Sequence, residues 1–219
     1  VNKTEKFMFD GERLIQHIIK QRYFEEEISN EVNLSYSDNQ VTVTTDYLTL
    51  VYTLNSEGYA SQCVYSLSSQ NRIYQFSYSA EGYLTGIVEN IDNREYSSTS
   101  LTYENGDITS ISSKMNGLEN KFIYEPGEES STYHLPCLGL LEIHPLTFHI
   151  EALYAGLLGK DPRHFTIRSC PAGSNDEKTV YSYGFDKKGN PSRMICQTTY
   201  AGGQASYYPY TRNISISFE

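Results

Sequence analysis

The stretch that decides the fold is FSYSAEGYLTGI, residues 76–87. Aromatic residues stand six and four positions before Gly82, and apolar residues stand two and five positions after it. Alternating bulky side chains suit a pleated strand that is buried on one face, and a glycine supplies the positive φ that a tight turn needs. We therefore interpret this stretch as a β-hairpin.

The same spacing recurs around other glycines of the chain. It is found at Gly58, at Gly189 and, with one residue fewer before the glycine, at Gly106. A separation of 24 residues divides Gly58 from Gly82, and again Gly82 from Gly106. A fixed period of this size is typical of a repeated supersecondary unit, here two strands and two turns.

The first segment, residues 7–19, fits two structures. As a helix, Asp10 would cap a stripe of Leu and Ile side chains. As a hairpin, alternating aromatic residues lead into an Asp10-Gly11 turn. We prefer the hairpin, because Asp-Gly after alternating aromatics is a strong turn signal and hairpin repeats follow it.

The region from residue 138 to residue 158 has a different texture, rich in Leu, Ile and Ala. Pro145 suits the first turn of a helix, and Gly159 suits the position just after its end. Apolar residues lie between them at helical spacing. We predict a helix from about Pro145 to Leu158. It is apolar on more than one face, which favours burial.

Together these patterns predict a mainly β protein with a single domain over residues 1–219. We expect an antiparallel meander of about twelve to fourteen strands, curled or closed as a barrel. A helical insertion spans about residues 136–170, and its apolar helix, at about 145–158, packs on the concave side of the sheet.

Composition restricts the classes of function. The net charge of −10, from 27 acidic and 17 basic residues, argues against binding to nucleic acid or to anionic membranes. No apolar run approaches the ~18 residues of a membrane-spanning helix. Strands such as residues 99–113 carry too many Ser, Thr and Asn for a spanning β-strand, so we expect no outer-membrane barrel.

The repeats resemble two known groups of proteins. The pattern aromatic-x-aromatic-Asp-x-x-Gly, with its Asp at Asp186, is similar to the tyrosine–aspartate repeats of large bacterial shell-forming proteins. The tandem hairpins, the Leu-Leu-Gly-Lys sequence at residues 157–160 and the turn DKKGNP at residues 186–191 resemble a Bacteroides-type family. Its members are secreted lipoproteins of unknown function with a porin-like β fold.

This second resemblance implies that the protein is exported and carries a lipidated N-terminus, trimmed from the present chain. It would then be anchored at the cell surface or in the periplasm of a Gram-negative bacterium. The resemblance also implies a curled antiparallel sheet, but it brings no catalytic or binding residues.

Histidine and cysteine residues flank the predicted helix. His134 and Cys137 precede it, and His164 and Cys170 follow it. Two His and two Cys could form a tetrahedral zinc site, but the irregular spacing disfavours it, and we predict no metal and no cofactor. If the protein is exported, a disulfide between Cys137 and Cys170 could close the helical insertion. Unpaired, buried thiols remain the alternative.

A cluster of tyrosines near the C-terminus is the candidate binding surface. Mixed with Gly and Pro, these residues could form a stacking platform for sugar rings or a protein partner. The alternative, which we favour because the chain contains 20 Tyr, is a Tyr-rich surface that shields the sheet. The four tyrosines are Tyr200, Tyr207, Tyr208 and Tyr210.

We predict a protein that is not an enzyme and that binds a glycan or a protein partner. Its distinctive residues are turn glycines and core aromatics rather than a convergent polar site. One alternative is a hydrolase that uses scattered carboxylates, such as those at residues 25–27 or 128–129, or a Cys–His pair. Another is a purely structural shell element. The oligomeric state does not follow from the sequence.

Overall fold

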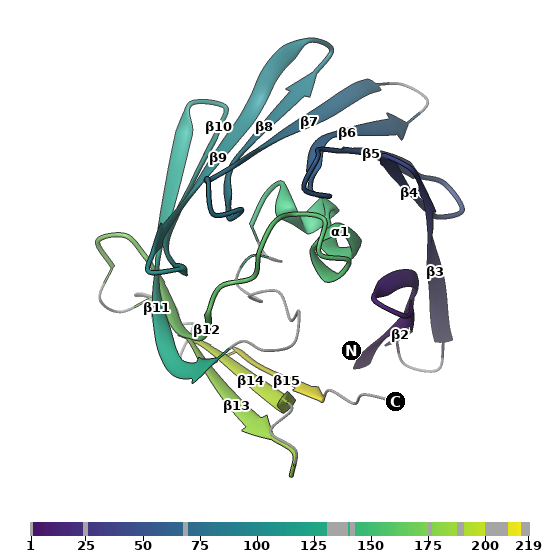
Figure 1. Cartoon of the computed structure of the whole chain (residues 1–219). Helices are drawn as coiled ribbons and strands as arrows, with labels where there is room; N and C mark the ends of the chain where they lie inside the picture. The colour runs from purple at the N-terminus through teal and green to yellow at the C-terminus, as the bar shows by residue number, and fades with distance from the viewer. Residues whose placement is uncertain are drawn as a thin grey trace. The chain divides into compact units, whose positions relative to one another are not determined.

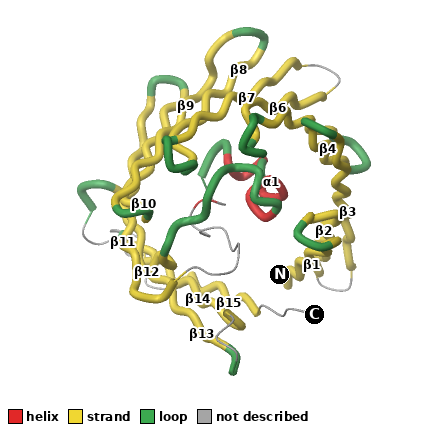
Figure 2. The backbone as a smooth tube through the Cα atoms, viewed as in Figure 1, coloured by secondary structure: helices red, strands yellow, loops and turns green. Residues whose placement is uncertain are grey.

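In the computed structural model, the described residues form fifteen strands of one antiparallel sheet. Figures 1 and 2 show the path of the chain. The structure describes residues 2–23, 26–67, 70–130, 140, 143–174, 177–187, 191–199 and 210–215. The bounds of the strands are β1 Asn2–Asp10, β2 Arg13–Tyr23, β3 Glu26–Ser37, β4 Gln40–Thr44, β5 Thr49–Leu54, β6 Ala60–Leu67, β7 Gln70–Tyr78, β8 Leu84–Ile91, β9 Arg94–Glu104, β10 Asp107–Met115, β11 Leu118–Ser130, β12 His164–Pro171, β13 Lys178–Phe185, β14 Pro191–Thr199 and β15 Tyr210–Ser215.

Each strand is bonded to the strand that follows it in the sequence, so the strand order runs from β1 to β15 without a crossover. The sheet is not closed, because β1 and β15 are the two ends of this order. The predicted antiparallel meander is confirmed, with slightly more strands than expected. The predicted N-terminal hairpin is also confirmed: β1 pairs with β2 through Asp10 and Arg13, and Gly11 has a φ of 59°.

The repeated glycines occupy equivalent turns. Gly58 and Gly82 have φ values of 85° and 91°, and each donates its N–H to the carbonyl three residues before it, on Asn55 and Ser79. Gly106, with a φ of 89°, follows Asn105 at 53° in a tighter two-residue turn. Positive φ at both central residues is the hairpin geometry that fits the twist of a sheet, and it explains the missing residue in this repeat.

Residues 157–163, which we call the connecting segment, contact these turns in order. Leu157 accepts a hydrogen bond from Ala60 N–H at 2.7 Å, two residues after the first turn glycine. Lys160 N–H donates to the carbonyl of Gly82 at 2.9 Å, and Arg163 N–H donates to that of Gly106 at 3.1 Å. The regular turns are therefore also regular attachment points for another part of the chain.

The predicted helix is much shorter than expected. A 3-10 turn, η2, covers Leu146–Phe148, and the helix α1 covers only Ile150–Tyr154. Gly156, at a φ of 68°, ends α1, with Gly156 N–H bonded to the carbonyl of Leu153. Together with a bond from Leu157 N–H to the carbonyl of Ala152, this is the Schellman arrangement of helix C-termini. Gly156, and not Gly159 as predicted from the sequence, therefore follows the end of the helix.

Two compact units divide the chain. Unit 1 contains residues 1–98 and 144–160, and unit 2 contains residues 99–143 and 161–219. Within unit 1, strands β2 to β8 bend around α1, which lies on their concave side (Figure 1). The core of unit 1 includes Leu14, Val41, Ile87 and, from the helical region, Leu146, all at most 1% exposed. The expected packing of the insertion is confirmed despite its shorter helix.

Unit 2 has its own core. Leu101, Ile108 and Ile111 are buried on β9 and β10, and Tyr181 and Met194 pack together on β13 and β14.

Candidate functional site

A buried carboxylate on the concave face of unit 1 is the most distinctive polar feature of the described residues. Glu89 of β8 is fully buried, and it lies beside Arg72 of β7. Residues two positions apart on a strand share a face, so Arg72 lies on the same face as the core residues Tyr74 and Phe76. The chain thus places two charged residues in positions that the pattern reserves for the core.

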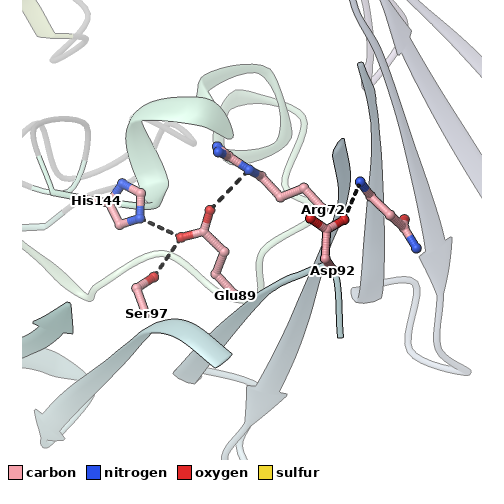
Figure 3. A network of polar contacts seen from close by, with 6 residues as sticks. Arg72, Glu89, Asp92, Ser97 and His144 are labelled. Carbon is pink, nitrogen blue, oxygen red and sulfur yellow. Dashed lines mark hydrogen bonds and ion pairs between the residues drawn. The ribbon is translucent and has the colours of Figure 1, made fainter. Parts of the chain in front are cut away.

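Three side chains surround the carboxylate of Glu89 (Figure 3). Ser97 of β9 donates its hydroxyl to Oε2 at 2.7 Å, and Nε2 of His144 lies 2.5 Å from the same oxygen. Arg72 approaches the other oxygen, Oε1, with its Nε at 3.4 Å. His144 precedes η2, so this network also ties the helical region of unit 1 to the sheet.

These contacts keep Glu89 ionised. Burial acts to raise the pKa of the carboxyl, but hydrogen bonds from His144 and Ser97 and the charges of His144 and Arg72 lower it below its ordinary value. A general acid needs the opposite, a raised pKa. The hydroxyl of Ser97 points at Glu89 rather than forming a nucleophile–base pair. The arrangement holds charge in place and is poorly suited to proton transfer.

Aromatic rings border the charged residues. The guanidinium carbon of Arg72 lies 5.4 Å from the ring centre of Tyr65 and 5.7 Å from that of Phe148, both within cation–π range. The ring of His144 meets that of Phe148 edge-on at 5.6 Å. Phe148 is 38% exposed, and the side chains of Arg72 and His144 are 19% and 27% exposed. We call Tyr65, Arg72, Glu89, Ser97, His144 and Phe148 the Arg72 cluster.

A second histidine, His149, is enclosed deeper in unit 1. Its Nδ1 lies 2.8 Å from the hydroxyl of Tyr52, and its ring contacts Tyr74 at 4.4 Å and Phe76 at 5.3 Å between centres. Burial lowers the pKa of His149 to about 3, which keeps the imidazole neutral. Its hydrogen-bond partner is thus Tyr52, whereas His144, directly before Pro145, pairs with Glu89.

A third histidine of unit 1, His17 on β2, is also fully buried. Its Nδ1 lies 2.7 Å from Glu151 of α1, and its Nε2 lies 3.6 Å from Glu5 of β1. Burial lowers the pKa of His17, but the hydrogen bonds and charges of the two carboxylates outweigh it and raise the pKa above the ordinary value. Phe7 stacks between His17 and Tyr154, at 4.1 Å and 3.8 Å from their ring centres.

The predicted tyrosine platform cannot be compared with this site. Tyr200, Tyr207 and Tyr208 lie outside the described residues, and Tyr210 is described only as part of the backbone of β15. The platform therefore stays a prediction.

The predicted disulfide between Cys137 and Cys170 also stays a prediction. Cys170 lies half-buried on β12, but Cys137 is outside the described residues, as is His134. No disulfide joins the three cysteines that the structure describes. Within the described ranges, no group of three His, Cys, Asp or Glu side chains could hold a metal ion. His164 instead binds Asp107 of unit 2 with both its backbone N–H and its Nδ1, each at 2.8 Å.

The sequence analysis did not identify the Arg72 cluster, although one signal was available. Arg72 lies two and four positions before Tyr74 and Phe76, and Glu89 lies two positions after Ile87. Both charged residues therefore stand at core-facing positions of alternating strands. A charge at such a position is rarely buried without a partner. The distance in sequence, 55 residues between Glu89 and His144, concealed which partner that would be.

An open antiparallel meander with a short helical region on the concave side of its first strands defines a porin-like β protein. The chain belongs to the family described as a domain of unknown function (DUF4595) with porin-like fold, whose model matches residues 9–193. This confirms the porin-like part of the sequence-based resemblance. Among the helices of the described residues, none is long and apolar enough to cross a membrane.

The structure is also similar to the crystal structure of a porin-like protein from Bacteroides uniformis ATCC 8492. The TM-score is 0.89 at 27% sequence identity, over 99% of this chain and 90% of the other. No curated protein matches the sequence.

Proposed function

We propose that this domain is a non-catalytic binding protein that holds a glycan at the Arg72 cluster. The observation that carries the proposal is the partly exposed ring of Phe148 beside two partly exposed cationic or polar groups, Arg72 and His144. Sugar rings have apolar faces that pack on aromatic side chains and hydroxyl rims that bond to charged groups. A partly open aromatic and charged cluster supplies both kinds of contact.

The electrostatics of Glu89 support binding rather than turnover. Its Oε2 is held by Ser97 and His144, and its Oε1 lies in an ion-pair contact with Arg72 at 3.4 Å without a hydrogen bond. Its lowered pKa leaves no proton to donate at neutral pH. A glycosidase would need a second carboxyl with a raised pKa near the first.

We also propose that the protein is exported and lipid-anchored at the cell surface or in the periplasm of a Gram-negative bacterium. The support is its similarity to a porin-like protein from a Bacteroides species. Metabolic labelling with palmitate, followed by cell fractionation of the protein expressed from its complete natural gene, tests this. An unlabelled protein in the cytoplasmic fraction would refute it.

A thermal-shift screen against a panel of oligosaccharides tests the binding proposal. A ligand at ~100 times its Kd stabilises the folded state by about 2.7 kcal/mol, which raises the melting temperature visibly. We expect Phe148→Ala to abolish the shift while the variant remains folded, because the ring is partly exposed.

Two controls separate this site from the other hypotheses. A double variant, Tyr207→Ala with Tyr208→Ala, should keep the shift if the Arg72 cluster binds the ligand and lose it if the tyrosine platform does. Each hit is then incubated with the protein and analysed by chromatography. Consumption of the ligand would show that the protein is an enzyme, and a panel without hits that is followed by capture of a protein partner would refute glycan binding.

A further inference from the structure

We infer that the glycan bound by the Arg72 cluster is acidic, with a sugar-ring carboxylate held by the outer amino groups of Arg72 and the ring packed on Phe148. This inference rests on the proposed function and specifies its ligand. It is carried by the way in which Arg72 divides its contacts between the core and the open side of the cluster.

The guanidinium of Arg72 meets Glu89 through a single atom. Its Nε is the atom that faces Glu89, at the long distance of 3.4 Å, and this atom is buried. The side chain as a whole nevertheless remains 19% exposed, and the buried Nε contributes nothing to this exposure. Arginine carries five N–H donors in a planar fork, and the Nε of Arg72 makes an ion-pair contact with Glu89 but no hydrogen bond. The donors on the two outer amino groups are the ones that would reach a ligand.

The surroundings of Arg72 determine how its positive charge is held. Ser97 and His144 make the short contacts to Oε2 of Glu89, at 2.7 Å and 2.5 Å, while Oε1 has only the 3.4 Å contact with Arg72. Arg72 is held instead between the rings of Tyr65 and Phe148. Rings restrain a cation without neutralising it. The cluster thus fixes the position of the guanidinium at its partly open side, next to the carboxylate of Glu89.

The shape of the guanidinium, the net charge of the chain and the ring of Phe148 together indicate which kind of anion would bind. A guanidinium fork matches a carboxylate with two parallel hydrogen bonds. The chain as a whole carries a net charge of −10, which repels a multiply charged ligand more strongly than a single carboxylate. The apolar ring of Phe148, 38% exposed and next to Arg72, favours a carboxylate attached to a ring. A uronic acid and other carboxylated sugars share this chemistry.

Calorimetric titration of the whole chain with a trisaccharide that carries a single galacturonic acid residue, and with its methyl ester, tests the inference. The ester keeps the shape and removes the charge. We expect the acid to bind at least about tenfold more tightly, since hydrogen bonds to a charged group contribute about 1.5 kcal/mol or more. Its affinity should fall as salt is raised, while that of the ester should not. A sialic acid trisaccharide distinguishes a general carboxylate site from one for uronic acids.

Arg72→Gln should remove the preference for the acid, and Arg72→Lys should restore part of it. The matched control is Arg168→Gln in unit 2, where Arg168 pairs with Glu125 at the surface and should have no effect. Because Arg72→Gln alters a buried contact, the fold of this variant is checked by circular dichroism. Phe148→Ala provides a second variant, which should bind both the acid and the ester more weakly.

Equal affinity for acid and ester would overturn the acidic ligand and leave glycan binding intact. Preference for a sulfated oligosaccharide would overturn the carboxylate. Acid binding that survives Arg72→Gln and Phe148→Ala would overturn the site. Absence of binding by every oligosaccharide would overturn both this inference and the proposed function.

Discussion

His17 and His149 are both fully buried in unit 1 and both adjoin α1, yet their surroundings push their pKa values in opposite directions. His149 meets a neutral hydroxyl and three aromatic rings. His17 meets two carboxylates and one stacked ring.

The difference shows two separate effects on a buried histidine. Burial makes protonation of the imidazole less favourable, and the charges and hydrogen bonds of its neighbours determine whether this effect is outweighed. For both residues, burial is the largest single effect, and it lowers the pKa. Only His17 has counter-charges close enough to reverse it. One short helix therefore borders a buried histidine that stays neutral and another whose pKa is raised, so that it takes up a proton more readily.

Removing the neutral histidine should have the largest effect. His149→Ala opens a cavity between Tyr52, Tyr74 and Phe76, and we expect a loss of about 3–5 kcal/mol in the free energy of unfolding. His149→Phe keeps the packing but removes the imidazole partner of the Tyr52 hydroxyl, which keeps only its contact with Cys63, so the loss should be about 1–3 kcal/mol. Denaturant unfolding at neutral pH measures both. Equal losses would mean that packing around His149 contributes little.

Removing the nearer carboxylate partner of His17 should have an intermediate effect. Glu151→Gln lowers the pKa of His17 towards its ordinary value and should destabilise the fold by about 1–3 kcal/mol near pH 6. Glu5→Gln is the matched control and should cost less, because Glu5 lies 3.6 Å away and is 34% exposed. NMR titration of the imidazole signals monitors the pKa directly. An unchanged His17 pKa in Glu151→Gln would contradict the assignment.

The pH dependence of stability should show both histidines in separate windows. The folded-state pKa of His149, about 3, lies below its unfolded value of 6.5, so the unfolded chain takes up the proton first as pH falls. Stability should decline below pH 6.5 by at most about 1.4 kcal/mol per pH unit. His17, with its raised pKa, stabilises fully below pH 6.5, and this contribution is lost as pH rises through the folded-state pKa.

Stability should therefore be greatest near pH 6.5 and fall on either side. His149→Phe should flatten the acidic arm between pH 6.5 and about 4.5, above the range in which carboxyl groups such as Glu89 titrate. Glu151→Gln should flatten the arm just above pH 6.5. Thermal melts across pH 4.5–8.5 measure the two arms, and a variant that flattens the wrong arm would reverse the assignment.

The smallest effect is expected for the ring between His17 and Tyr154. Phe7→Leu removes both stacking contacts but keeps an apolar side chain, and should cost about 0.5–1.5 kcal/mol. It should leave the pKa of His149 unchanged. A large loss would mean that stacking, rather than the carboxylates, holds His17 in place.

Much of the sheet could be predicted from the sequence because its determinants are local. Gly58, Gly82 and Gly106 were expected to adopt positive φ in hairpin turns, and they do. The prediction of a long helix was wrong for a physical reason. The apolar spacing continues to Leu158, but Gly156 adopts the left-handed conformation and ends the helix before that residue. Leu157 and Leu158 are buried all the same, although they are not helical.

The Arg72 cluster could not be assembled from the sequence. Its members come from β6, β7, β8, β9 and the residues around η2, and only the strand pairing and the path of the helical region bring them together. Arg72 pairs with Tyr65 across β6 and β7, which a correct strand register would have shown. The approach of His144 to Glu89 depends on tertiary packing, for which the local pattern contains no information.

The connecting segment sets a limit on how such a sheet can evolve. Its successive attachment residues, Leu157, Lys160 and Arg163, advance by three positions, while the turn glycines of the hairpins they meet advance by 24. Duplication of one hairpin unit would therefore lengthen the row of turns and leave the new one without its hydrogen bond, unless three residues were inserted near Lys160 in the same event. Relatives with a different number of repeats should carry connecting segments whose lengths differ in proportion.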